Sequence, residues 1–164
     1  MARQTKKQIK FEQECNELAR QVWLGNIDYL ANHYDPKIHG PYADTGHDFT
    51  VDCYKFDDWT LSHFAIWGGN KNNIFEALME LDNNFHAFNV VRSTTPYDLA
   101  CETGQLEFVK KYYNEDYNSC DDHRIVSNAG KGMAAGFDID GGPSWEQHIH
   151  WDIIDWVREG KIGS

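Results

Sequence analysis

The chain has 164 residues, of which 41% are apolar and 14% aromatic, so its composition excludes a disordered protein and suits one domain or a short array of repeats. Its formal net charge is −11, but the first ten residues hold four basic and no acidic side chains, which leaves −15 on the remaining 154 residues. Residues 11–164 are therefore acidic enough to repel nucleic acid and anionic lipid. Their negative charge serves either solubility or the attraction of a basic protein surface.

The N-terminal segment, residues 1–10, is basic and polar, and we expect it to be flexible. It lacks the apolar core of a signal peptide, and no window of the chain has the apolar length of a membrane span. The cysteines form no C-x-x-C pair, so a structural zinc site is not expected. These features predict a cytosolic protein with free thiols at its four cysteines, Cys15, Cys53, Cys101 and Cys120.

Residues 11–34 have the rhythm of two short helices separated by a glycine, which is typical of a capping unit. In ELARQVWLGNIDYLANHY (17–34), Gly25 is followed by Ile27 and Leu30 at helical spacing. Residues 35–57 then form an insertion with two prolines and two glycines, in which the alternation at 49–56 indicates a short strand or one arm of a hairpin. Such an insertion is either a functional loop or a tolerated surface loop.

The clearest helical unit spans residues 93–120. Thr95 is suited to be an N-cap, Pro96 to be the first helical residue and Asp98 to be the acid of a capping box. Gly104 ends this helix, and a second helix follows from Leu106. Helices this short are not stable alone in water, so the unit must bury its apolar stripe against neighbours.

A similar unit spans residues 58–88. After its first helix, its second helix is expected to contain Ile74, Ala77, Leu78 and Leu81. The two units repeat with a period of 32 to 35 residues, which predicts a solenoid. At the longer spacing, Thr60, Ala65 and Gly69 precede Thr95, Ala100 and Gly104.

This pattern resembles the ankyrin repeat, whose signature T-P-x-x-x-A-x-x-x-G opens the first of two helices. Thr95, Pro96, Ala100 and Gly104 match the signature in residues 93–120. In residues 58–88 the match includes His63, which in the family links the helix start to the adjoining loop. The sequence departs from the family at Leu61, Ser62, Lys71, Asn73, Tyr97 and Asp98.

The C-terminal unit, residues 123–160, lacks the signature and is enlarged by residues 138–147. Its first helix is expected within 124–137 and its second around Trp151, Ile154 and Val157. The resemblance implies an all-α fold, a short ankyrin-like solenoid of about four helix-turn-helix repeats with atypical ends, in one domain of residues 11–164. The expected repeats are residues 11–34, 58–88, 93–120 and 123–160, with the loop or hairpin insertion at 35–57.

Groups suited to catalysis or metal binding are few. His148, His150 and Asp152 offer metal ligands, but positions two apart do not share one face of the helix expected there. Cys101 lies at a packed position without an assignable activating base, and no stretch has the spacing of a P-loop. We therefore expect a protein that is not an enzyme and uses no cofactor or metal. A metal-dependent enzyme built on His148 and His150 is an alternative.

The resemblance implies that loop tips and first helices contact a partner along a concave face. Trp59 and Trp67 stand at such positions, where they form an exposed aromatic anchor rimmed by acid, or are buried under the 35–57 insertion. Carried over from the family, the predicted contact residues are Phe56, Asp57, Trp59, Trp67, Val91, Arg92, Thr94, Glu102, Thr103, Asp122 and His123.

The function that the resemblance implies is non-catalytic binding of a protein with a basic or mixed surface, by occlusion or scaffolding. We expect neither membrane association nor direct nucleic-acid binding. The lack of a second domain suggests a viral, phage or bacterial inhibitor of a host protein, which would act in the host cytoplasm. Another alternative is an acidic mimic of nucleic acid that blocks a DNA- or RNA-binding enzyme, which requires carboxylates aligned along one face.

Overall fold

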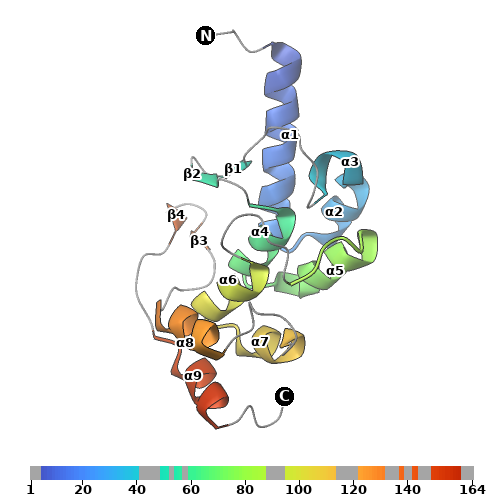
Figure 1. Cartoon of the computed structure of the whole chain (residues 1–164). Coiled ribbons are helices and arrows are strands. Elements are labelled where there is room, and N and C mark those ends of the chain that lie inside the picture. The colour runs from blue at the N-terminus through green and yellow to red at the C-terminus, as the bar shows by residue number, and fades with distance from the viewer. Residues whose placement is uncertain are drawn as a thin grey trace.

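The computed structural model describes residues 5–40, 49–51, 54–56, 59–87, 95–113, 122–131, 137–138, 142–143 and 149–159. These residues are predominantly helical, which confirms the all-α class (Figure 1). The α-helices in these ranges are α1 (Lys6–Trp23), α2 (Ile27–His33), α3 (Pro36–His39), α4 (Leu61–Trp67), α5 (Ile74–Leu81), α6 (Pro96–Glu102), α7 (Leu106–Tyr112), α8 (Asp122–Lys131) and α9 (Trp151–Arg158). Short antiparallel ladders join β1 (Phe49–Val51) to β2 (Tyr54–Phe56) and β3 (Phe137–Asp138) to β4 (Gly142–Pro143).

Eight of these helices pack in consecutive pairs, α1 with α2, α4 with α5, α6 with α7 and α8 with α9. The first three pairs turn at Gly25, Gly69 and Gly104, whose φ angles are 78°, 88° and 77°. In each turn the glycine N–H bonds to the carbonyl three residues back, and the next N–H bonds to the carbonyl five residues before it. This is the Schellman motif, which needs a left-handed residue. The glycine breaks expected from the sequence are therefore confirmed at all three positions.

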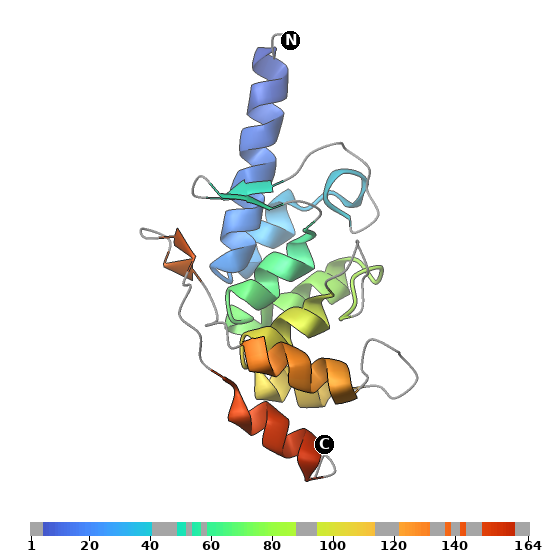
Figure 2. The same ribbon diagram turned by 60° about the vertical axis from the view of Figure 1, so that its left-hand side comes forward.

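The first helices of the pairs form one row, in which α1 packs on α4, α4 on α6 and α6 on α8 (Figures 1 and 2). Behind them, α2 packs on α5 and α7 on α9. Hydrogen bonds tie successive turns to each other: Asn72 Nδ2 donates to Gly25 O at 3.0 Å and Gln105 Nε2 donates to Ile66 O at 2.6 Å. The units that begin at Thr60 and Thr95 thus lie side by side, as the repeat spacing predicted.

The core runs along this row of hairpins, because each short helix buries one apolar stripe against its neighbours. The largest fully buried side chains come from both helices of successive pairs. Tyr97 is fully buried and its hydroxyl donates to Val109 O at 2.8 Å, which joins the two helices of one hairpin. Other fully buried side chains are Trp23, Leu30, Phe64, Ile66, Phe75, Leu78 and Leu99.

The N-terminal segment differs from expectation, because α1 begins at Lys6 rather than after a flexible leader. Thr5 and Gln8 form a reciprocal capping box, so residues 6–10 are helical, and residues 1–4 lie outside the described ranges. In the 35–57 insertion, α3 precedes two short antiparallel strands in which Phe49 pairs with Phe56. The predicted strand is therefore present, and it is one of a pair of strands that both lie within 49–56.

The second helix of the 58–88 unit begins at Ile74, later than the equivalent helix at Leu106. A short 3₁₀ helix, Lys71–Asn73, precedes it. Asn70, Asn72 and Asn73 adopt positive φ angles there, a conformation that asparagine tolerates. In the C-terminal unit, α8 and α9 confirm the two expected helices, although α8 begins at Asp122. None of the described helices combines the length and the apolar character that crossing a membrane requires.

Candidate functional site

Each of two first helices begins with a capping box that contains a buried polar side chain. At the start of α6, Thr95 Oγ1 accepts from Asp98 N at 3.0 Å, and Asp98 Oδ2 accepts from Thr95 N at 3.1 Å. At the start of α4, His63 Nδ1 accepts from Thr60 N at 3.2 Å. The predicted capping roles of Thr95 and Asp98 are confirmed, and His63 holds its helix start as the resemblance implied.

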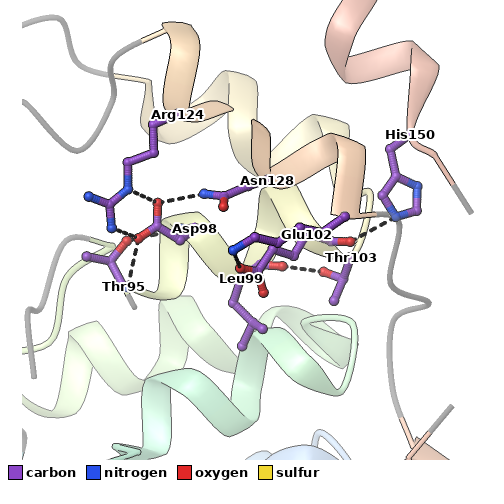
Figure 3. A network of polar contacts seen from close by, with 9 residues as sticks. Thr95, Asp98, Leu99, Glu102, Thr103, Arg124, Asn128 and His150 are labelled. Atoms are coloured by element: carbon purple, nitrogen blue, oxygen red, sulfur yellow. Dashed lines mark hydrogen bonds and ion pairs between the residues drawn. The ribbon is translucent and has the colours of Figure 1, made fainter. Parts of the chain in front are cut away.

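The Asp98 carboxylate also reaches across to α8 (Figure 3). It accepts from Arg124 Nε at 2.8 Å, from Asn128 Nδ2 at 3.0 Å and from Arg124 Nη2. Asp98 is only 2% exposed, so its charge requires these donors, and the hydrogen bond to it raises the pKa of Arg124 above its ordinary value. Asp98 is therefore the polar centre of the contact between α6 and α8.

A second group of polar contacts lies at the other end of the same two helices. Glu102 is 8% exposed and forms an ion pair with Lys131, whose Nζ donates to Glu102 Oε1 at 3.1 Å. Burial raises the pKa of Glu102 above its ordinary value, while Lys131 acts in the opposite direction. His150, directly before α9, donates from Nε2 to Glu102 O at 3.0 Å, because a carbonyl oxygen can only accept (Figure 3). The contact supplies one of the partners that a helix C-terminus needs.

These contacts determine what the network does. Asp98 meets Arg124 near the start of both helices and Glu102 meets Lys131 at the end of both, so α6 and α8 run parallel. Both carboxylates are engaged in these pairs, and His150 uses Nε2 to hold the helix end. The network thus aligns α6, α8 and the start of α9 in a fixed register. Among the described residues, no group of three or more His, Cys, Asp or Glu side chains is placed to hold a metal ion.

The two tryptophans proposed as an anchor lie together. Their ring centroids are 5.7 Å apart in an edge-to-face arrangement, and the Trp59 ring also stacks on His63 at 5.6 Å. Trp67 is only 4% exposed, whereas Trp59 is half-buried. The prediction of an exposed anchor is therefore wrong for Trp67, because α4 buries that residue in the core, and Trp59 alone reaches the surface.

Two further predicted contact residues are buried, Glu102 at 8% and Thr103 at 4% exposed. The expectation that they face a partner is wrong, because α8 and His150 cover the C-terminal end of α6. Asp122 and His123 are exposed at the start of α8, and Phe56 is the last residue of β2. The predicted contacts Asp57, Val91, Arg92 and Thr94, and the candidate metal ligand His148, lie outside the described residues.

The residues that sequence reasoning missed are Arg124, Asn128 and Lys131, the α8 partners of the network. One signal pointed to them: Asp98 occupies a position where the ankyrin pattern has histidine. A buried acid at that position needs a cationic or amide donor from a neighbouring helix. Cys15 and Cys101, the two cysteines in the described ranges, are buried thiols outside any disulfide. Comparison of the chain with protein-family models, with curated proteins and with solved structures found no match.

Proposed function

We propose that the chain is an ankyrin-like solenoid that binds a protein partner in the cytoplasm without catalysis. The observation that carries this proposal is the parallel row of first helices, α1, α4, α6 and α8, each packed on the next. Three Schellman turns with the same hydrogen bonds and three capping boxes, at the starts of α1, α4 and α6, repeat along the row, which supports a repeat architecture.

The proposed contact edge is formed by the N-terminal ends of the first helices. Parallel packing brings these ends to one side of the row, so Trp59, before α4, and Asp122 and His123, on α8, face the same edge. Trp59 is held by ring contacts with His63 and Trp67, which fixes its orientation before binding. A partner therefore meets a surface that loses little conformational entropy on association.

The partner is expected to present a basic or mixed surface. The chain beyond its first ten residues carries −15, and Asp122 adds a carboxylate to the proposed edge. Charges at the rim of an interface mainly accelerate association, whereas a desolvated aromatic residue contributes more to affinity. Trp59 is accordingly the proposed anchor, and Asp122 the proposed steering charge.

The proposal is tested by affinity capture with the tagged chain from extracts of the cells that express it. Wild type is compared with Trp59→Ala and with the double variant Asp122→Asn, His123→Ala. Asp155→Asn, which changes an exposed aspartate on α9, is the matched control, and circular dichroism verifies that each variant is folded. Capture should fall with the first two variants and not with the control.

Equal capture by all four proteins would overturn the proposed edge. If the captured protein is released by duplex DNA and still binds Trp59→Ala as wild type does, the acidic nucleic-acid mimic becomes the better explanation.

A further inference from the structure

A cleft of about 480 Å³ is lined by residues of α1, α2 and α3 and does not include Trp59, Asp122 or His123. Its volume is in the range of about 300–1,000 Å³ that is typical of small-molecule pockets. Figure 1 shows α2 and α3 beside the lower half of α1. The lining combines an apolar floor, an aromatic wall and two carboxylates, and each of these features selects for a property of the occupant.

The apolar floor comes mainly from α1. Phe11, Cys15 and Leu18 are four and three residues apart, so they lie on one face of the helix. Cys15 and Leu18 are 3% and 1% exposed, and Ile38 of α3 adds a partly buried side chain. A floor of this kind accommodates an aliphatic stem.

The aromatic wall is formed by Tyr29 and His33 of α2. Their rings stack with centroids 3.9 Å apart and an interplanar angle of 15°. His33 Nδ1 donates to Tyr29 O at 2.9 Å, because the carbonyl can only accept, and this bond fixes the imidazole orientation. A stacked pair of flat rings presents a π surface that a guanidinium group can cover.

The charge of the cleft is negative. Glu14 and Asp35 contribute carboxylates, and the described residues that line the cleft include no lysine or arginine. Lys10 approaches Glu14 at 3.9 Å, but both side chains are largely exposed, so that pair is weak. Burial raises the pKa of Cys15 to about 11, with further contributions from Glu14 and Glu12.

The side of the cleft that α3 forms adds no positive charge. His39 Nδ1 accepts from Asp35 N at 3.0 Å, which leaves its Nε2–H available as a donor. Burial lowers the pKa of His39, so the imidazole is neutral at physiological pH, although Asp35 acts in the opposite direction. The charged side chains among the described lining residues are therefore Glu14 and Asp35, both acidic.

We propose that this cleft binds an arginine side chain of the protein partner. The aliphatic stem lies on Phe11, Leu18 and Ile38, and the guanidinium stacks on the Tyr29–His33 pair between Glu14 and Asp35. Arginine fits better than lysine, because its planar group stacks on aromatic rings and can donate to two carboxylates at once. The inference deepens the proposed function and rests on it, since it names the basic residue that the partner supplies.

The test is an NMR titration of the full ¹⁵N-labelled chain with three blocked peptides, acetyl-Gly-Gly-X-Gly-Gly-amide, where X is arginine, lysine or citrulline. Citrulline keeps the shape of arginine but is neutral. The arginine peptide should shift amides of α1, α2 and α3 saturably, and the citrulline peptide should bind about tenfold more weakly. Absence of saturable shifts, shifts confined to other helices, or equal binding of lysine or citrulline overturns the proposal.

Two charge-neutralising variants sharpen this test. Asp35→Asn retains an N-cap side chain for α3, and Glu14→Gln changes an exposed position, so both should remain folded. Each variant should bind the arginine peptide about fivefold more weakly than wild type does. Glu80 is an exposed acid on α5, and Glu80→Gln should not change the affinity. An equal effect of all three overturns the assignment of the carboxylates. Because the peptide assay does not involve the Trp59 edge, its failure is distinguishable from failure of the proposed function.

Discussion

Asp98 and Arg124 form a doubly hydrogen-bonded ion pair between the third residue of α6 and the third residue of α8. The carboxylate is almost fully buried, whereas the guanidinium side chain is 41% exposed. The pair is therefore asymmetric, because loss of the cation leaves a buried charge and loss of the anion leaves a cation that water can solvate.

Arg124→Gln should consequently lower the free energy of unfolding by about 2 kcal/mol, less than a fully buried pair would lose, because water reaches part of the site. Thermal unfolding followed by circular dichroism measures the change. Arg158→Gln, an exposed position on α9, is the matched control and should stay within about 0.5 kcal/mol of wild type. Equal effects of the two substitutions would show that the Asp98 contact contributes nothing to stability.

Glu102 should give the stability a measurable pH dependence. Its pKa in the folded chain lies above the ordinary value of 4.5, so the folded state retains this proton to higher pH than the unfolded state does. The contribution of Glu102 to the free energy of unfolding therefore declines as pH rises from the pKa of the unfolded state to the higher pKa of the folded state, and it is constant above the folded-state pKa. Glu102→Gln removes the titration, so its stability relative to wild type should increase between pH 4 and pH 7. A relative stability that is unchanged or decreases would contradict the raised pKa.

Three glycines should respond to alanine in a definite order. A Cβ at Gly68 would lie 2.2 Å from Trp23 O, so Gly68→Ala must push α1 and α4 apart and should cost about 2–3 kcal/mol. At Gly69 there is open space but φ is +88°, so alanine should cost about 1–2 kcal/mol from backbone strain. Gly130, in α8, has open space, and alanine there should stabilise by about 0.5–1 kcal/mol. Melting temperatures of the three variants give the order, and a loss at Gly68 no larger than the loss at Gly69 would refute the packing at Gly68.

His150 should act as a structural donor. Gln can place an amide N–H near the same carbonyl, so His150→Gln should retain most of the stability, whereas His150→Ala should lose about 1 kcal/mol. Equimolar zinc should leave the melting temperature unchanged, because Nε2 already donates to Glu102 O and Nδ1 faces the Gly104 backbone. A stoichiometric rise with zinc would restore the metal-site alternative.

The elements that the sequence predicted well are those specified by local chemistry. Thr95, Pro96 and Gly104 encode both ends of α6 within ten residues, and the three turn glycines each encode their own Schellman motif. Ile74, which the sequence predicted within the second helix of the 58–88 unit, is the first residue of α5. The repeat spacing aligns Lys71 with Leu106, but the three left-handed asparagines delay the helix start to Ile74.

The candidate site was harder to predict, because burial depends on contacts between units. Glu102 and Thr103 match exposed family positions, but α8 and His150 cover them, and the unit that provides this cover lacks the repeat signature. Likewise, Arg124 stands 26 residues from Asp98, and no local pattern connects them. Trp59 and Trp67 are the same residue type at positions that the repeat pattern treats alike. Only the packing of α4 makes the Trp67 ring buried and the Trp59 ring half-buried.

The row of helices is joined differently at its two ends. Where α1 meets α4, Trp23 packs against Gly68, whereas α6 meets α8 through two ion pairs. Added salt screens the ion pairs, whereas guanidinium chloride and urea both weaken apolar contacts. Guanidinium chloride is itself a salt and urea is not. Guanidinium chloride should therefore separate α8 from the row at a lower denaturant concentration than it needs to separate α1, and this difference should be smaller in urea. The choice of denaturant would thus decide from which end the chain comes apart.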